Sequence, residues 1–408
     1  MMKFLTHSLT LFIFFFSLIV PKTLRAEVAN HQLPTGGTVV SGTVNISQSS
    51  NTMTINQTSS QAIINWETFN LGKDASIYFN NNSSSNTTLN QIVDNFKSVI
   101  LGSIYSNGKL FINNPNGISI GANANIRAHS FVASAMRIAN QDFLNRNYQY
   151  THNQTALLEN SGSINAQYVA LMAPEVVNKG TITSAQGSTN MAASDNMLLS
   201  INEDHSIHIK VNPSSIKASA SNKGSIVAEN GMVKIRADMA QDAIDATIRA
   251  PETAASGIVS VNGVIKLVSN SGSIKAKQIT LAAGERGAVE VSGTIEAVST
   301  TGEGGSVELQ GKEIIVTTGA NINASGTVAG GRLIIGGSWI DHDFNVIQTT
   351  FATIQQNSTL DVSSLEGNAG SIFIGSNQSV PGSLTSVQGV LYARTGSSRK
   401  KQGGEGRG

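Results

Sequence analysis

The sequence predicts an all-β protein that folds as a right-handed parallel β-helix, a single-stranded solenoid with small excursions outside its coils. Composition is the first observation behind this prediction: of 408 residues, 13% are charged and 5% are aromatic, whereas 39 are glycine. Such a profile is typical of many short strands joined by tight turns. The second observation is a recurring phrase, polar–Gly–Ser/Thr–Ile–any–small, found at Ser161–Ala166, Lys179–Ser184, Lys223–Ala228, Ser271–Ala276 and Ser292–Ala297.

The spacing of these phrases indicates stacked coils. Their glycines are 18, 44, 48 and 21 positions apart, which we interpret as one, two, two and one coils of about 20 residues each. The glycine supplies a turn, and the isoleucine begins a short strand that can bury its apolar face only by stacking at ~4.8 Å on the next coil. We therefore expect roughly 16 to 18 coils and a rod on the order of 80 Å long. A β-sandwich also has short strands and glycine turns, but it does not predict the recurrence.

Residues 1–26 have the features of a secretory signal peptide. Lys3 precedes an apolar stretch from Leu9 to Val20, and the small residue Ala26 offers a cleavage site. No later segment approaches twenty consecutive apolar residues, so we expect no stable membrane insertion. A chain without cysteine must be stable without disulfides, which long stacked solenoids can be.

The charge balance argues against nucleic acid as a partner. The formal net charge is +1, and a nucleic-acid-binding protein normally carries a basic patch or stripe.

An ordered series of short motifs begins at Leu33 and ends near Tyr150. It runs Leu33–Gly37, Val39–Gly42, Ala62–Trp66, Phe69–Gly72, Leu89–Val93, Ile100–Gly102, Asn107–Phe111, Asn114–Ile118 and Phe131–Ser134. This series resembles the N-terminal secretion domain of the filamentous haemagglutinin and high-molecular-weight adhesin family. We accordingly expect a haemagglutinin-type secretion domain over 27–150, continuing pectin-lyase-like β-helix coils over 151–390, and a disordered, basic, Gly-rich tail over 391–408.

The resemblance implies two-partner secretion through the periplasm to the extracellular space or the cell surface. The implied partner is an outer-membrane β-barrel transporter with periplasmic recognition domains, through which the chain passes unfolded and folds from its N-terminal domain. The family's secretion motif corresponds here to Asn114, Pro115, Asn116 and Gly117. From the residues alone these four predict a tight turn, and both fold nucleation and direct contact with the transporter stay open. A second upstream Asn-Pro-Asn motif of some relatives has no counterpart, because Asn80–Asn86 contains no proline.

The resemblance also implies a function in attachment, as an adhesin that binds a host-cell receptor or glycan. A first alternative is a haem- or haemopexin-type nutrient-capture exoprotein of the same family. A second is an extracellular polysaccharide lyase or hydrolase on a β-helix, which would need two or three carboxylates gathered on neighbouring coils. The repeated phrases place no recurring Asp at outward positions, and no nucleophile motif is visible. We therefore predict no enzyme, no catalytic residue and no cofactor.

Two histidine-containing segments are candidate metal sites. His205 and His208 stand beside Glu203 and Asp204, but a spacing of three on a strand places the two imidazoles on opposite faces. Asp341–Asp343 also suits a polar turn better than a site. We expect solvated loops at both places and no metal.

One stretch departs from the coil pattern. Residues Ser130 to Leu158 contain Phe131, Phe143 and Tyr150, and we expect an excursion there, a short helix or hairpin packed against the coils.

Overall fold

The computed structural model describes residues 27–184, 187–202, 206–250, 258–336, 338–340 and 346–396. The expected signal peptide with its cleavage site at Ala26, His205 and the Asp341–Asp343 turn lie outside these residues. Within the described ranges, no helix is long and apolar enough to cross a membrane.

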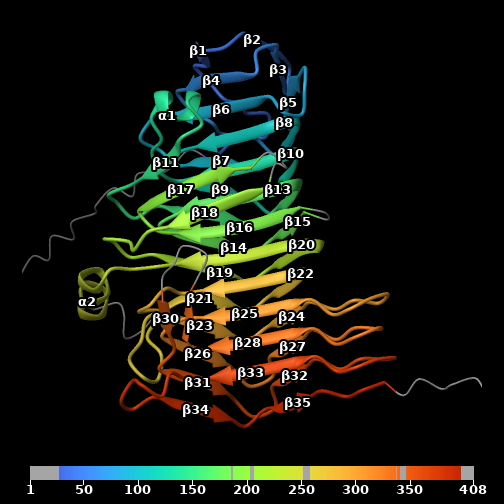
Figure 1. The fold of residues 1–408 in the computed structure, drawn as a ribbon. Helices are drawn as coiled ribbons and strands as arrows, with labels where there is room; N and C mark the ends of the chain where they lie inside the picture. The colour runs from blue at the N-terminus through green and yellow to red at the C-terminus, as the bar shows by residue number, and fades with distance from the viewer. Residues whose placement is uncertain are drawn as a thin grey trace, which may run out of the picture.

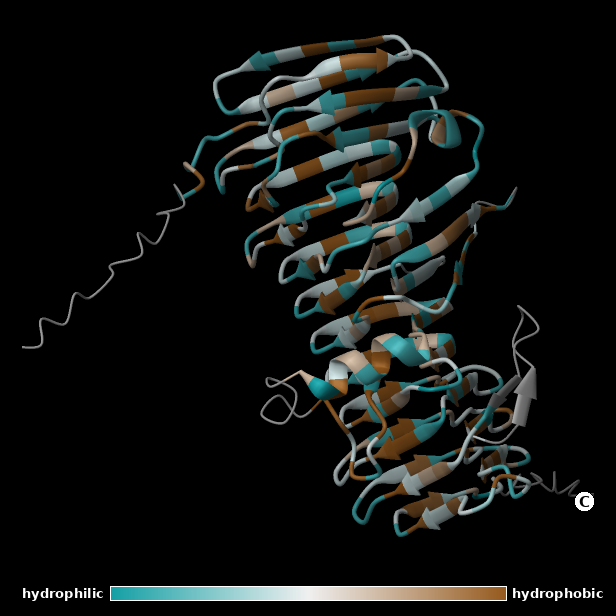
Figure 2. Cartoon of the chain, turned by 90° about the vertical axis from the view of Figure 1, so that its left-hand side faces the viewer, coloured by the Kyte–Doolittle hydropathy of each residue, from teal (hydrophilic) through white to brown (hydrophobic). Residues whose placement is uncertain are grey.

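The chain winds downward from its N-terminus as a right-handed parallel β-helix (Figure 1). Each coil runs over three faces, which we call face 1, face 2 and face 3 in chain order. Five long strands bend from face 1 onto face 2, so these two faces form one continuous sheet, and face 3 forms a separate ten-stranded sheet. Apolar and polar bands alternate along the strands and repeat from coil to coil (Figure 2), as expected when one side of every strand faces the core.

The strands of the three faces have the following bounds. The bent strands that cover both face 1 and face 2 are β8 (Ser103–Asn113), β10 (Asn125–Ser134), β13 (Ser163–Ala173), β20 (Ser225–Ala237) and β22 (Ser273–Ala282). Face 1 also contains β3 (Thr52–Gln57), β5 (Ser76–Asn81), β15 (Thr181–Thr183), β24 (Thr294–Glu296), β27 (Asn321–Asn323), β32 (Thr359–Asp361) and β35 (Val390–Tyr392). Face 2 also contains β4 (Gln61–Trp66), β6 (Thr87–Ile92), β16 (Ser188–Ala193), β25 (Ser306–Gln310), β28 (Arg332–Gly336) and β33 (Ser371–Gly375). Face 3 consists of β7 (Ser98–Ile100), β9 (Ile118–Ile120), β12 (Leu157–Asn160), β14 (Glu175–Asn178), β19 (Ser219–Asn222), β21 (Lys266–Asn270), β23 (Ala288–Val291), β26 (Glu313–Val316), β31 (Phe351–Ile354) and β34 (Leu384–Val387).

The number of coils is smaller than the sequence suggested. One inward position of face 1 stacks through twelve levels, formed by Met53, Ile77, Ile104, Ile126, Ile164, Ile182, Ile226, Ile274, Ile295, Ile322, Leu360 and Leu391. The glycine spacings of 44 and 48 positions each correspond to one coil, since Ile182 pairs with Ile226 and Ile226 with Ile274. The expectation of two coils for each was wrong, and at ~4.8 Å per level the rod is about 50 to 60 Å long.

Insertions at one corner explain these long coils. In the part of the chain that the structure describes, the backbone leaves the stack between face 2 and face 3 four times, after β10, β16, β20 and β28. These insertions carry α1 (Asn140–Leu144) with β11 (Tyr148–Thr151), β17 (Asn196–Ile201) with β18 (Ile207–Val211), α2 (Gln241–Arg249), and β29 (Ser338–Ile340) with β30 (Val346–Gln348). They lie on the same side of the rod (Figure 1).

The first two insertions build a second apolar core outside the coils. Strands β11, β17 and β18 form an antiparallel sheet that covers the outer side of face 2. There Phe143 and Tyr148 pack against the outward ring of Phe111, with ring centroids 5.6 and 5.5 Å away. The predicted excursion is thus confirmed, although it begins only after Ser134 because β10 runs to that residue. Strands β17 and β18, which pack with this excursion, were expected to belong to the coils and do not.

The corner between face 3 and face 1 holds a buried ladder of amides. Asn160, Asn178, Asn222 and Asn270 are fully buried and each ends a face 3 strand. The Nδ2 of each donates to the Oδ1 of the next, at 2.8, 2.8 and 2.7 Å. Stacked amides thereby satisfy one another's polar groups, which a buried Asn requires.

Two residues after each of these asparagines stands the glycine of the repeated phrase. A Cβ on Gly224 would lie 2.1 Å from the carbonyl oxygen of Gly180 in the coil above, and one on Gly272 would lie 2.0 Å from that of Gly224. The corner therefore leaves no room for a side chain, and this is why glycine recurs in the phrase.

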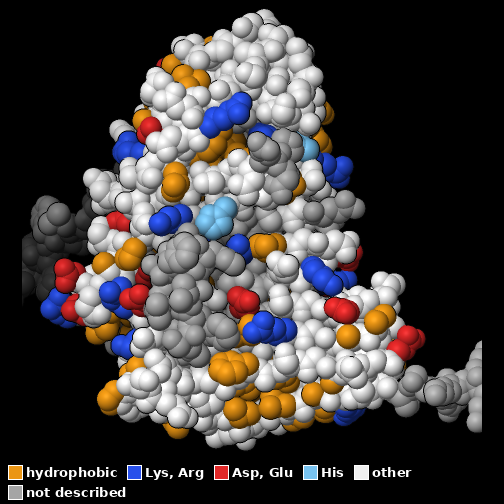
Figure 3. Space-filling view, in the orientation of Figure 1, with side chains coloured by type: hydrophobic (Ala, Val, Ile, Leu, Met, Phe, Trp, Pro, Cys, Tyr) orange, Lys and Arg blue, Asp and Glu red, His pale blue; other side chains and the backbone are white. Residues whose placement is uncertain are grey.

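The two ends of the rod differ. At the N-terminal end, β1 (Thr38–Ser41) and β2 (Val44–Ser49) pair antiparallel with β4 and β3 and close the stack. At the other end the last coil exposes apolar side chains, among them Phe373, Leu384 and Val390, and hydrophobic atoms gather there (Figure 3).

Residues 391 and 392, which were expected to belong to the C-terminal tail, lie in a strand. Leu391 and Tyr392 belong to β35, which pairs with β32, and the Arg394 guanidinium lies 4.4 Å from the Tyr392 ring centroid. Leu391 continues the inward ladder, so coil stacking extends past the expected boundary. Residues 397–408 lie outside the described ranges.

Replacing Gly224 by alanine should destabilise the rod by roughly 1–3 kcal/mol, because the new methyl group overlaps the carbonyl of Gly180. Gly302→Ala is the matched control, since the nearest atom to its added Cβ would be 3.4 Å away. Urea unfolding followed by circular dichroism measures both variants. Equal midpoints for the two would contradict the close approach at this corner.

Replacing Asn178 by alanine should cost about 1–3 kcal/mol, because Asn222 Oδ1 loses its donor and Asn160 Nδ2 keeps only the carbonyl oxygen of Gly162, at 3.4 Å. Hydrogen exchange should show the loss of protection concentrated in β12, β14 and β19. The exposed Asn165, for which no side-chain hydrogen bond is found among the described residues, provides a control: Asn165→Ala should leave both stability and protection unchanged. A uniform loss in Asn178→Ala along the whole rod would argue against a local ladder.

Candidate functional site

The first motifs of the secretion-domain series meet in the N-terminal cap. Strand β1 follows Leu33–Gly37 and pairs antiparallel with β4, which contains Ala62–Trp66. Gly37 lies flat against the Trp66 ring: a Cβ at that position would be 2.6 Å from a ring carbon. Trp66 is 1% exposed and meets Phe69 edge to face at 5.7 Å. The glycine thus allows the chain to cross over the largest side chain of the cap.

A buried asparagine joins this cap to the first coils. The Trp66 Nε1–H donates to Asn90 Oδ1 at 3.0 Å, and Asn90 Nδ2 donates to the carbonyl oxygen of Phe111 at 3.1 Å. Trp66, Asn90 and Phe111 come from three successive strands of face 2, β4, β6 and β8. Three separate motifs of the series therefore form one hydrogen-bonded path from cap to stack.

The secretion motif forms the corner between β8 and β9. The N–H of Gly117 donates to the carbonyl oxygen of Asn114 at 3.0 Å, which closes a β-turn with Pro115 at its second position. Gly117 has φ +109°, a value that glycine tolerates and other residues rarely adopt. The turn predicted from the sequence is present, and all four motif residues take part in it.

The side chain of Asn114 is the centre of this corner. It is fully buried. Its Nδ2 donates to the Phe96 carbonyl oxygen and to Ser98 Oγ, both at 2.9 Å, and its Oδ1 accepts from the Asn116 N–H at 2.9 Å. The Asn116 Nδ2 in turn donates to the Asp94 carbonyl oxygen at 2.8 Å. The two asparagines therefore hold the loop of residues 93–98 against the turn.

This loop presents two apolar side chains to solvent. Val93 is 57% exposed and Phe96 is 64% exposed, whereas Asn114, Pro115 and Gly117 are buried. Beside the loop a groove of about 570 Å³ runs between the motif turn and the first insertion, lined by Asp94, Asn95, Pro115, Asn116, Arg137 and Asp142 among others. The sequence reasoning did not single out Phe96, although a Phe flanked by Asp94, Asn95 and Lys97 is an available signal of exposure.

Burial shifts the protonation of several groups around the first insertion. Desolvation, with a further contribution from Arg137, lowers the pKa of His152, which lies beside Pro115. Burial and the neighbouring Arg146 lower the pKa of Lys109, and burial raises the pKa of Tyr148 and Tyr150.

The predicted chemical sites can be compared with the part of the chain that the structure describes. There, no group of three or more His, Cys, Asp or Glu residues is arranged to hold a metal ion. His208 lies in β18 opposite Ser200. Some acidic side chains on neighbouring coils are ion-paired, as in Lys179–Glu159 at 2.6 Å and Lys217–Glu175 at 3.3 Å.

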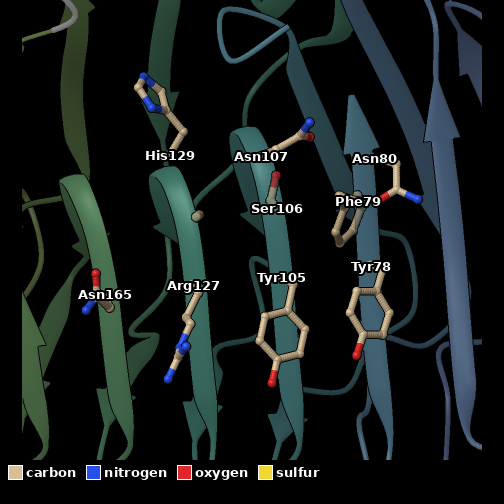
Figure 4. Close-up of a pocket in the computed structure, with 10 residues that line it drawn as sticks. Tyr78, Phe79, Asn80, Tyr105, Ser106, Asn107, Arg127, His129 and Asn165 are labelled. Atoms are coloured by element: carbon tan, nitrogen blue, oxygen red, sulfur yellow. The ribbon is translucent and has the colours of Figure 1, made fainter. Parts of the chain in front are cut away.

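A second hollow lies on the outer side of face 1 (Figure 4). Its cavity volume is about 570 Å³, and Tyr78, Tyr105, Arg127 and Asn165 cross it side by side from four neighbouring strands. The sequence signal for this hollow is the repeat of Ser-Ile-Tyr at Ser76–Tyr78 and Ser103–Tyr105. It was not among the coil phrases that predicted the fold.

The chain was compared with known proteins. A family model described as the TPS secretion domain matches residues 30–275. A heme/hemopexin-binding protein of Haemophilus influenzae is 27% identical over 208 residues, which are 48% of this chain and 23% of that protein. A second heme/hemopexin-binding protein of Haemophilus influenzae is 29% identical over 138 residues, 33% of this chain and 15% of its own. The chain thus spans a quarter or less of these relatives.

A solved structure supports the fold. The HMW1 secretion domain from Haemophilus influenzae aligns with a TM-score of 0.69 and 22% identity, covering 88% of this chain and all of that one. The resemblance drawn from the motif series is confirmed, as is the parallel β-helix. Because the family model covers more than half of the sequence, the chain belongs to the family of TPS secretion domains, the domains that mark exoproteins for two-partner secretion.

Proposed function

We propose that this protein is exported through an outer-membrane β-barrel transporter with periplasmic recognition domains and then acts in attachment, as an adhesin at the cell surface or in the extracellular space. Exoproteins of this family are secreted by an outer-membrane transporter partner. The observation that carries the proposal is the family match over 30–275 on a capped β-helix. Within it we assign the export function to residues 27–150 and the binding surface to the coils of 151–390.

We further propose that Asn114, Pro115, Asn116 and Gly117 serve export by organising the fold. Three of the four are buried in the folded domain, and the side-chain hydrogen bonds of Asn114 all go to other groups of the protein. A direct contact by these side chains would need them at the surface. The turn instead sets the position of the 93–98 loop, and the exposed Phe96 on that loop is the group available for contact with the transporter.

Asn114→Ala should lower secretion much more than Asn116→Ala in cells that also express the transporter. The first change removes the hydrogen bonds that Asn114 makes to the buried Ser98 Oγ, the Phe96 carbonyl and the Asn116 N–H, and each buried group left without a partner costs about 1–3 kcal/mol. The second removes bonds of a partly exposed side chain and should cost about 1 kcal/mol. Secreted protein is quantified in the medium, with the periplasmic pool as reference. If Asn116→Ala abolishes export while Asn114→Ala does not, surface recognition of the motif is the better account.

Attachment is tested with the full secreted chain coupled to beads and added to cultured epithelial cells. We expect beads carrying the chain to bind several times more cells than albumin-coated beads, and soluble chain to compete. Binding equal to that of albumin would exclude the attachment function for this chain while leaving its export route untouched.

A second candidate function is capture of haem or of a haem carrier, and the two matched relatives favour it because both are heme/hemopexin-binding proteins. A haem titration and a haemopexin pull-down with the purified chain separate this candidate from attachment. A shifted haem absorption band or captured haemopexin would support it. We propose no enzymatic activity: a lyase would need free carboxylates of adjacent coils in a groove, and the described Glu159 and Glu175 are paired with lysines.

A further inference from the structure

Four outward side chains of face 1 form a row across neighbouring coils. Tyr78 of β5 is in register with Tyr105 of β8, Tyr105 with Arg127 of β10, and Arg127 with Asn165 of β13. Parallel strands are spaced ~4.8 Å apart, so the four heads span roughly 14 Å. Figure 4 shows them projecting from the same surface of the sheet. We call these four residues the Tyr–Arg row.

The polar heads of this row are available to a ligand. Among the described residues, no hydrogen bond or ion pair is found for the side chains of Tyr78, Tyr105, Arg127 or Asn165. Their neighbours in the same hollow are engaged by the protein itself: Asn107 exchanges hydrogen bonds of 2.7 Å with the backbone of Asn81 in both directions. The amide of Asn107 is thus already engaged, whereas the four heads of the row are open to a ligand.

The row is also held in place before any ligand arrives. The rings of Tyr78 and Tyr105 are stacked with centroids 5.0 Å apart and planes 17° from parallel. At that separation the rings are offset, so part of each face stays uncovered, and Tyr78 is 40% exposed. The backbones of both tyrosines are fixed in the sheet, so binding a ligand would cost little conformational entropy.

The chemistry of the row selects a class of ligand. Uncovered tyrosine faces pack against apolar surface while their hydroxyls bond to polar groups, which suits the mixed surface of a sugar ring. Asn165 adds an amide that can both donate and accept. Arg127 is always charged and forms paired, charge-assisted hydrogen bonds with carboxylates and similar anions. A row about 14 Å long fits a short oligosaccharide laid across the strands.

We propose that the Tyr–Arg row is a binding site for an anionic oligosaccharide, with Tyr78 and Tyr105 under the sugar rings and Arg127 on a carboxylate or sulfate group. Tyr78, Tyr105 and Arg127 lie within residues 27–150 and Asn165 lies in the coils beyond, so this site extends the binding surface assigned to 151–390 into the secretion domain. The inference rests on the proposed attachment function and gives it a ligand class, but it is tested without cells.

The experiment measures binding of the full secreted chain to three oligosaccharides by calorimetry. The probes are an oligogalacturonate, which carries carboxylates, a dextran sulfate oligomer, which carries sulfates, and cellohexaose, which is neutral. We expect one or both anionic probes to bind more tightly than cellohexaose. Whether the carboxylate or the sulfate probe binds better identifies the anion.

Three variants locate the site. Arg127→Gln should weaken the preferred anionic probe by roughly 10- to 100-fold, the equivalent of a lost charge-assisted hydrogen bond, and should remove the preference over cellohexaose. Tyr105→Ala should weaken all bound probes, whereas Tyr105→Phe, which keeps the ring, should lose less. Arg332→Gln is the control, because Arg332 is an exposed arginine on face 2 of a distant coil. Thermal unfolding confirms that each variant is folded.

Two results would overturn the inference: no binding of any anionic probe by the wild-type chain, or binding that Arg127→Gln leaves unchanged. Equal affinity for cellohexaose and both anionic probes would overturn the assigned ligand class. Cells distinguish this failure from failure of the proposed function. If beads attach to cells and the Arg127→Gln chain attaches equally well, attachment stands and the Tyr–Arg row is not its site. If oligosaccharides bind to the row but beads do not attach to cells, the row stands as a binding site and the attachment function fails.

Discussion

The strand register of each coil is set by the coil before it, and the corner between face 3 and face 1 allows only one register. Backbones there approach so closely that Gly224 could not carry a Cβ beneath the Gly180 carbonyl. The buried amides of Asn160, Asn178 and Asn222 each donate to the matching amide of the next level. A slip by one residue would place a side chain against a carbonyl and leave buried amides unpaired, which costs free energy on both counts. Stacking is therefore sequential, as in other solenoids whose units contact only their neighbours.

Sequential stacking requires a first level that does not depend on a previous one. The antiparallel pairs of the cap supply it: β1 with β4 and β2 with β3 satisfy each other's backbones without a coil above them. Trp66, Asn90 and Phe111 then form one hydrogen-bonded path into the first coils, and Asn114 ties the corner before β9 to the corner before β7. The motifs that identify the family are thus concentrated where the stack begins. A chain that emerges from a transporter N-terminus first would meet this template before any other part of the rod.

The sequence was sufficient to predict the β-helix, the motif turn and the first insertion, because stacked Gly–Ile phrases, Pro115 with Gly117, and clustered aromatic residues are local signals. It could not give the number of coils. Insertions at one corner lengthen a coil without altering its phrase, so the spacing of 48 between Gly224 and Gly272 looks like two coils and is one. The hydrogen bonds of Asn114 to the 93–98 loop, and the row formed by Tyr78, Tyr105 and Arg127, depend on the pairing of distant strands. No short window of sequence contains that information.

The central claim is that order spreads from the cap along the coils. Pulsed hydrogen exchange during refolding of the purified chain, read by mass spectrometry, tests it most directly. Amides of β3 to β8 should become protected first, those of β13 to β22 next, and those of β27 to β35 last. Earliest protection in the last coils, or simultaneous protection of all twelve levels, would contradict it.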